Sequence, residues 1–295
     1  MKRFIARHLY TIAVGASLAA FLTAREFGLP LEAVVVAASV VVLVAAALLE
    51  RLLPFEPAWR RSDGDTTTDA ASAIVLIGLV DPLLKAAMPV LAIAALRGVG
   101  TPWRAFPIGW PFMAQVLLAL LWIEFAKYWS HRAHHRSPAL WWLHALHHGS
   151  RRLYWLNNFR FHPLNHAINS LVSMLPLWLA GTPAEVLLGV AAISQPVLML
   201  QHANLDLRSG WLNHVFSTNE VHRWHHSTQP HEANSNFGSA LMLWDHVFGT
   251  FRHEAGRRRP VAVGLFGNGG GYPSARSYLQ QLRSMFSPAC CYPNR

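Results

Sequence analysis

Four long apolar runs constrain this chain more than any other feature of its sequence. A helix needs about 20 mostly apolar residues to cross about 30 Å of hydrocarbon. The runs cover about residues 9–24, 32–49, 70–98 and 110–130. With 53% hydrophobic and only 14% charged residues, the chain is also too apolar for an ordinary soluble protein. The sequence therefore predicts an all-α integral membrane protein.

The edges and interruptions of these runs predict how the helices are arranged. Basic residues flank the first two runs, so the positive-inside rule places the N-terminus and residues 51–65 in the cytoplasm. The first run could also be a cleaved signal peptide, but the second run follows closely and favours a retained anchor. Asp81-Pro82 interrupts the third run, which is either one broken span or a shallow hairpin. A further apolar stretch at 167–201, broken at 181–183, predicts a re-entrant hairpin.

Histidine is unusually frequent, with 17 in 295 residues. The pattern His-x-x-His-His occurs three times, at His131, His134 and His135, at His144, His147 and His148, and at His222, His225 and His226. On a helix, positions i, i+3 and i+4 share one face, so each cluster can direct two or three imidazoles at one point. A single histidine at a helix end is usually an interfacial polar group, but three copies of one pattern predict a metal site.

The number of clustered histidines limits the kind of metal site. A structural zinc takes four ligands and a catalytic zinc takes about three plus water, so these clusters exceed both requirements. Two metal ions sharing most of the imidazoles are therefore predicted. Imidazole suits iron, copper, zinc and nickel, so ligand type alone leaves the metal open. Because imidazole must be neutral to bind, metal occupancy is expected to fall below about pH 6.

The residues around the clusters resemble the fatty acid hydroxylase and sterol desaturase superfamily of membrane di-iron enzymes. The main matching segments are YWSHRAHHRSPALWWLHALHH at 128–148, VHRWHHS at 221–227 and NFGSALMLWDHVFGTF at 236–251. RFHPLNH at 160–166 and QHANLD at 201–206 also resemble family segments. The likeness covers about residues 115–255, whereas the first hundred residues match only as generic membrane helices.

Together, the apolar runs and the resemblance predict the architecture. A bundle of about four transmembrane helices plus a re-entrant hairpin is expected to be capped by a cytoplasmic helical region that carries a histidine-rich dimetal site. We expect an N-terminal transmembrane region over 1–109, a di-iron catalytic region over 110–255 and a C-terminal tail over 256–295.

The resemblance also implies which residues hold the metal. The implied catalytic metal ligands are His131, His135, His144, His147, His148, His222, His225 and His226, with His202 as a ninth metal ligand. His134 is the less common ligand within the first motif. His162, before Pro163, is a ligand, a donor to a ligand or a helix cap. Bound imidazoles usually donate their other N–H to an acceptor. Candidates for orienting a ligand are Glu124, Asn204, Asn234, Asn236 and Asp245.

The activity implied by the resemblance is oxidation of a lipid. Two iron ions, cycling between Fe2+ and Fe3+ with O2 as co-substrate, would hydroxylate a C–H bond, and desaturation at the same site is the alternative. The chain has no haem-attachment motif, no cysteine framework for an iron–sulfur cluster and no dinucleotide-binding glycine motif. Electrons are therefore expected from a separate donor, either a ferredoxin-like protein or a cytochrome reductase system.

A metal transporter or metal-storage protein is the alternative outside enzymology. Such a protein would place ionisable ligands near the middle of its spans, whereas these clusters fall at span ends among arginines such as Arg132 and Arg223. The net charge of +10 fits an anionic membrane surface, and no nucleic-acid partner is expected. We expect a bacterial inner-membrane protein with its active site facing the cytoplasm. The substrate, the oxidised carbon and the oligomeric state stay open.

Overall fold

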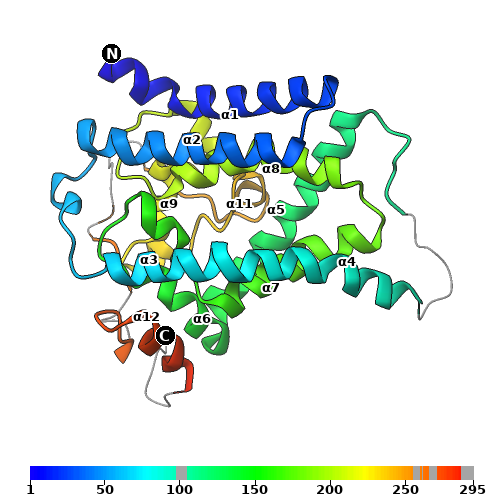
Figure 1. The fold of residues 1–295 in the computed structure, drawn as a ribbon. Coiled ribbons are helices and arrows are strands. Elements are labelled where there is room, and N and C mark those ends of the chain that lie inside the picture. Colours follow the sequence, from blue (N-terminus) through cyan, green and yellow to red (C-terminus); the bar gives the residue numbers. More distant parts are fainter. Residues whose placement is uncertain (98–104, 255–259, 261, 266–270, 287–295) are drawn as a thin grey trace.

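The apolar runs form helices of membrane-spanning length (Figure 1). The computed structural model describes residues 1–97, 105–254, 260, 262–265 and 271–286. Among these residues, five helices are long and apolar enough to cross a membrane: α1 (Lys2–Glu26), α2 (Leu31–Leu52), the helix Thr66–Ala95, α5 (Phe112–Arg136) and α8 (Ala184–Gln201). The described residues contain isolated β-bridges but no β-strand. The prediction of an all-α membrane protein is therefore confirmed.

The third apolar run forms one long helix with an irregular turn. α3 (Thr66–Val75) continues through a π-helical turn, η2 (Leu76–Val80), into α4 (Asp81–Arg97). In this turn the Asp81 N–H donates to the Leu76 carbonyl, five residues earlier, which is the π pattern. The turn lies directly before Pro82, which has no N–H to donate. Of the two predicted arrangements, the structure has the interrupted single span.

The hairpin predicted over 167–201 consists of α7 (Pro163–Leu179) and α8. Gly181 makes the turn with a φ of 80°, a conformation that glycine adopts readily. α8 packs against α1, α2 and α5, so it lies at the centre of the bundle. A Cβ at Gly189 would lie 2.8 Å from a Val116 methyl carbon, which shows how closely α8 approaches α5.

The helix ends near the histidine clusters lie together at one end of the bundle. The Tyr10 hydroxyl of α1 accepts a hydrogen bond from the Asn219 N–H, and the Leu53 carbonyl after α2 accepts one from the Asp206 N–H beyond α8. α1 is thus packed into the fold beside the clusters. The shorter helices are η1 (Pro57–Arg60), α6 (Pro138–His148), η3 (Trp155–Phe159), η4 (Gly210–His214), α9 (Asn219–His225), α10 (Pro230–Ala233), α11 (Leu243–Val247), α12 (Tyr278–Arg283) and η6 (Ser284–Phe286).

A proline separates the first two histidine clusters into two helices. The residue before a proline avoids the helical conformation, and Ser137 is extended, with φ −97° and ψ 123°. Pro138 then begins α6, a position where its missing N–H costs nothing. The chain therefore turns between α5 and α6, and the second cluster packs beside the first.

Candidate metal centre

The structure brings nine histidines together in two groups. The first group is His131, His135, His144, His148 and His225, and the second group is His147, His202, His222 and His226. Within each group, one ring nitrogen from each residue lies within 4.8 Å of all the others. All nine except the partly buried His131 are buried. These are the same nine residues that the resemblance implies as metal ligands.

The two groups adjoin because single helices contribute to both. On α6, His144 and His148 belong to the first group and His147 belongs to the second. The ring centroids of His148 and His226, one from each group, are 4.4 Å apart. Two ions held by these groups would therefore be neighbours within one site.

Hydrogen bonds on the outer side of the rings fix how the imidazoles are protonated. His131 Nδ1 donates to the Phe237 carbonyl (2.9 Å), His147 Nδ1 to the Arg160 carbonyl (3.2 Å) and His225 Nδ1 to the Ser235 carbonyl (2.8 Å). A carbonyl oxygen can only accept, so each Nδ1 carries the proton and each Nε2 carries a lone pair. His144 and His202 make the same kind of bond to the side-chain oxygens of Asn165 and Asn157.

The inner nitrogens are arranged as metal ligands. Nε2 of His144 lies 3.0 Å from Nε2 of His131 and 3.2 Å from that of His148. In the second group, Nε2 of His222 lies 3.0 Å from that of His202 and 3.1 Å from that of His226. Two nitrogens bound about 2.1 Å from one ion at a right angle lie about 3.0 Å apart. Converging lone pairs at this spacing repel one another unless a cation lies between them, so the residues fit two metal ions.

Aromatic side chains surround the two groups and keep the site apolar. The Phe237 ring lies against His131, His135 and His225, with centroid distances of 5.2 to 5.9 Å. The buried Trp141 packs edge-on against His135 at 5.1 Å, and Phe161 stacks on His147 at 4.2 Å. An apolar shell of this kind limits the access of water to bound ions and strengthens electrostatic interactions inside.

Burial holds the histidines outside the spanning helices in the neutral form. Burial, reinforced by neighbouring imidazoles, lowers the pKa well below 6.5 for His144, His147, His148, His222, His225 and His226. Burial alone lowers the pKa of His202 to about 3. A base with a lowered pKa is protonated only at lower pH, so these rings stay able to bind metal where an ordinary histidine is already charged.

This shift changes the pH dependence expected from the sequence. We now expect metal occupancy to fall at a lower pH than it would for exposed histidines, because protons compete with metal only near the lowered pKa values. The measurement is the metal content of purified protein after equilibration at each pH. A loss centred near pH 6.5 would show that the rings titrate as exposed histidines do.

His134 has a different environment from the other members of its cluster. Its Nδ1 donates to the Ser130 carbonyl (2.7 Å), and its Nε2 accepts from the Asn165 amide (3.0 Å), so both ring nitrogens are engaged. The same Asn165 accepts from His144 Nδ1 (2.9 Å). His134 therefore helps to fix the Asn165 side chain, which in turn orients the His144 ring. His134 itself lies in neither group.

The structure places His162 as a helix cap. It is the N-cap of α7, and its Nδ1 accepts from the Leu164 N–H (3.1 Å). His162→Ala is expected to leave the metal content unchanged and to lower the free energy of unfolding by about 1 kcal/mol, as loss of an N-cap does. Metal analysis and denaturant titration of the variant check both parts. Loss of one ion in the variant would identify His162 as a ligand instead.

Asp245 and Glu124 act on the loop that orients His131. Asp245 accepts hydrogen bonds from the N–H groups of Phe237 (2.8 Å) and Gly238 (2.7 Å) and from the Thr250 hydroxyl (2.7 Å). Buried Glu124 of α5 accepts from the N–H groups of Ala240 and Leu241 in the same loop, both at 2.9 Å. Both carboxylates thus fix the Phe237 carbonyl that His131 needs, without touching a histidine of the two groups.

The three asparagines considered from sequence have separate roles. The Asn234 side chain lies beside the His135 ring. Asn204 pairs with the backbone of Glu56, at 2.9 and 3.0 Å. Asn236 donates to the Val221 carbonyl of α9 and, at a φ of 56°, adopts a left-handed conformation that asparagine tolerates better than most residues.

Sequence reasoning missed Asn157 and Asn165, which orient His202 and His144. Asn165 lies within RFHPLNH, where the histidines drew attention and the asparagine between them did not. The carbonyls of Arg160, Ser235 and Phe237 carry no sequence signal, because every residue has a carbonyl. Of two tryptophans near the first histidine clusters, Trp141 is buried against the histidines, whereas Trp129 is 42% exposed and packs on Phe248.

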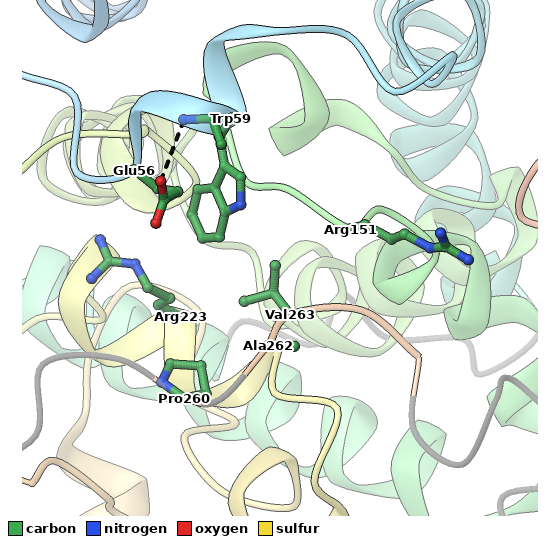
Figure 2. A pocket seen from close by; sticks show the side chains of 8 residues that line it. Glu56, Trp59, Arg151, Arg223, Pro260, Ala262 and Val263 are labelled. Carbon is green, nitrogen blue, oxygen red and sulfur yellow. Dashed lines mark hydrogen bonds between the residues drawn. The ribbon is translucent and has the colours of Figure 1, made fainter.

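A hollow of about 350 Å³ lies beside α9, and none of the nine histidines lines it. Figure 2 shows Glu56 and Arg223 on one side of this hollow and Arg151 on the other, with Trp59 between them. The Arg223 guanidinium lies 3.5 Å from the centre of the Phe55 ring. Although Arg223 follows His222 in sequence, it lines this separate hollow.

Comparisons with known proteins relate the chain to lipid-oxidising enzymes. The family model for fatty acid hydroxylase matches residues 116–250. An ornithine lipid hydroxylase, OlsE from Rhizobium tropici, is 35% identical over 246 residues, which cover 82% of this chain and 72% of that protein. No solved structure gives a significant match.

Alkylglycerol monooxygenases from animals are more distant relatives. The Caenorhabditis elegans protein is 25% identical over 187 residues, covering 63% of this chain and 37% of that protein. The Homo sapiens protein is 26% identical over 158 residues, covering 52% of this chain and 34% of that protein. The matched part of this chain thus spans well under half the length of either monooxygenase.

Proposed function

Because this chain belongs to the fatty acid hydroxylase family, we propose that it is a membrane-bound di-iron oxygenase that hydroxylates a C–H bond of a membrane lipid. The observation that carries the proposal is the pair of adjoining histidine groups whose inner lone pairs converge. The nine histidines of these groups are the proposed ligands of two iron ions. Residues 110–255 are the proposed catalytic region, between an N-terminal transmembrane region over 1–109 and a tail over 256–295.

When bound, a pair of iron ions supplies the activation of O2 that no amino-acid side chain provides. In the overall reaction, one oxygen atom enters the C–H bond and the other becomes water, with two electrons and two protons supplied from outside. The residues of the chain hold the imidazoles neutral and oriented. Trp141, Phe161 and Phe237 would restrict the access of bulk water to the site and so limit side reactions with solvent.

The position of the site suits a substrate that lies in the bilayer. The histidine groups lie at the ends of α5 and α8, which are long and apolar enough to span a membrane. A lipid can therefore reach the site without crossing bulk water. The relative with 35% identity is named for ornithine lipid, so an ornithine-containing lipid is the first substrate class that we propose to assay.

The amino-acid sequence bears on the electron donor and on the orientation of the protein in the membrane. A ferredoxin-like protein or a cytochrome reductase system is the proposed donor, because the chain contains no motif for a redox cofactor that would deliver electrons. The basic segments beside the spans support a site that faces the cytoplasm, and the bacterial source of the relative with 35% identity supports a bacterial inner-membrane location.

Desaturation is the alternative outcome at the same site, since hydrogen removal precedes both products. The names of the relatives, hydroxylase and monooxygenase, favour hydroxylation. A metal transporter is less well supported, because the histidine groups lie at the ends of the candidate spans rather than at their middle.

The test is lipid mass spectrometry of cells with and without the gene, grown under oxygen enriched in the heavy isotope. Hydroxylation predicts one lipid class that gains the mass of one heavy oxygen atom only when the gene is present. Loss of two hydrogens from a lipid would indicate a desaturase instead. Unchanged lipids, despite bound iron and a competent electron donor, would contradict both oxygenase activities.

A further inference from the structure

Three buried carboxylates of the N-terminal helices contact the segment 150–160, beside the second histidine group. They are Glu50 at the end of α2, Asp65 just before α3 and Asp69 within α3. All three lie outside residues 116–250, the part that the family model matches. Buried carboxylates are costly unless they are paired, so their partners point to a specific role.

Asp69 and Arg160 form a fully buried ion pair, with Arg160 Nη1 donating to Asp69 Oδ1 at 2.9 Å and both side chains 0% exposed. The Tyr154 hydroxyl donates to the other oxygen of Asp69 at 2.7 Å. Arg160 also donates from Nη2 to the Gln281 side chain of α12 (3.0 Å). The Arg160 side chain is therefore held from two sides.

Arg160 holds His147 through two contacts. Its side-chain Nε donates to the Leu146 carbonyl (2.9 Å), which belongs to the peptide bond directly before His147. Its own backbone carbonyl accepts from His147 Nδ1 (3.2 Å). One residue thus fixes both the backbone at His147 and the orientation of its ring.

The same segment orients His202. Asn157 accepts from His202 Nδ1 at 3.0 Å, and its amide donates to the Arg152 carbonyl at 2.6 Å. The Arg152 side chain donates to both oxygens of Asp65, with distances of 2.8 to 3.1 Å. Glu50 accepts from the Trp155 N–H at 2.7 Å. His147 and His202 are both members of the second group.

The first group is oriented by other parts of the chain. The Nδ1 atoms of His131, His144 and His225 bond to Phe237, Asn165 and Ser235. The Phe237 loop is held by Asp245 and Glu124, not by the N-terminal carboxylates. The bonds that orient the rings of the two groups therefore come from different parts of the chain, although α6 carries members of both groups.

We propose that Asp69 and Arg160 are positioning residues for the second histidine group alone, so that the N-terminal helices hold one of the two metal ions in place. The inference rests on the proposed two-metal site. It gives the N-terminal helices a role in metal binding in addition to spanning the membrane.

The experiment measures iron per chain in the purified full-length protein after loading with Fe2+. The parent protein is expected to hold about two ions, and Asp69→Asn, which keeps the shape of the side chain but removes its charge, about one. Glu32→Gln is the control, because Glu32 pairs with Lys85 at an exposed site and should leave the iron content unchanged.

Ligand variants identify which ion is lost. In a His131→Ala/His135→Ala background, where the second group binds the remaining iron, Asp69→Asn should remove that iron. In a His222→Ala/His226→Ala background, where the first group binds the remaining iron, Asp69→Asn should have no further effect. Non-additivity of this kind is the signature of residues that act on one site.

Tyr154→Phe provides a milder test if Asp69→Asn does not fold. It removes only the hydroxyl that donates to Asp69. Release of one iron to a chelator should become about 10-fold faster, while release of the other stays unchanged. Tyr128→Phe is the matched control, because the Tyr128 hydroxyl bonds to Thr250 and Arg132 instead. In this variant, iron should be released from the second group at the same rate as in the parent protein.

The outcomes separate this inference from the proposed function. A parent protein that binds no iron contradicts the two-metal site itself. A parent protein with two ions whose Asp69→Asn variant also keeps two, or loses both equally, overturns the positioning role and leaves the oxygenase proposal in place. Equal acceleration of both release steps in Tyr154→Phe would overturn it as well.

Discussion

His148→Ala is expected to abolish lipid oxidation and to remove iron from the first group. Nε2 of His148 lies 3.2 Å from that of His144 and 3.1 Å from that of His225. Its ring also stacks on His226 of the second group at 4.4 Å. Changes to residues that merely orient a ligand typically cost 10- to 100-fold in metal affinity or activity, so loss of this central imidazole should cost more than about 100-fold.

The measurements for His148→Ala are iron per chain and oxygen consumption in the presence of lipid and reductant. His8→Ala is the matched control, because His8 is exposed on α1 and belongs to neither group. The control should keep both its iron and its activity. A His148→Ala protein that retains full turnover would remove the basis for assigning the reaction to these histidines.

Gly238→Ala is expected to disrupt the loop that orients His131. A Cβ at this position would overlap the Leu241 carbonyl and would lie 2.8 Å from an Asp245 carboxylate oxygen. Because backbone cannot move aside cheaply, the loop must shift, and the hydrogen bonds that the Phe237 and Gly238 N–H groups donate to Asp245 must lengthen. We expect a loss of about 3 kcal/mol in the free energy of unfolding and at least about 10-fold weaker iron binding.

Gly15→Ala is the control for this variant. Gly15 lies within α1, and an added Cβ there would have no atom within 4 Å. Alanine is favoured over glycine inside a helix by about 0.5 to 1 kcal/mol, so the control should be at least as stable as the parent. Thermal unfolding in detergent and iron titration compare the two. Equal behaviour of the two variants would show that the Phe237 carbonyl is not needed to orient His131.

Much of the fold followed from local pattern. The lengths of the apolar runs predicted the spanning helices, and Gly181 with Pro183 predicted the turn between α7 and α8. The interruption at Asp81-Pro82 was recognised, but its form was not, because a proline is compatible with either a break or a π turn. Hydropathy gives the length of an apolar segment and not its hydrogen-bonding pattern.

The sequence predicted only in part which histidines belong to each group. Helical spacing predicted that each cluster shares a face, and the resemblance implied the nine residues. The division of neighbouring His147 and His148 between two groups depends on how α6 packs, which spacing along one helix does not determine. Asn157, Asn165, Asp69 and Arg160 were missed for a similar reason, since their partners are distant in sequence or are backbone carbonyls.

The placement of α6 sets a mechanical limit on the centre. Because the adjacent residues His147 and His148 belong to different groups, one peptide unit of α6 would set the spacing between the two proposed ions. Substitutions elsewhere could tilt or shift α6 as a whole, but they would leave the length of this peptide unit unchanged. A redesign that aims to change the spacing between the ions must therefore alter the backbone of α6 itself, by inserting a residue or unwinding its last turn.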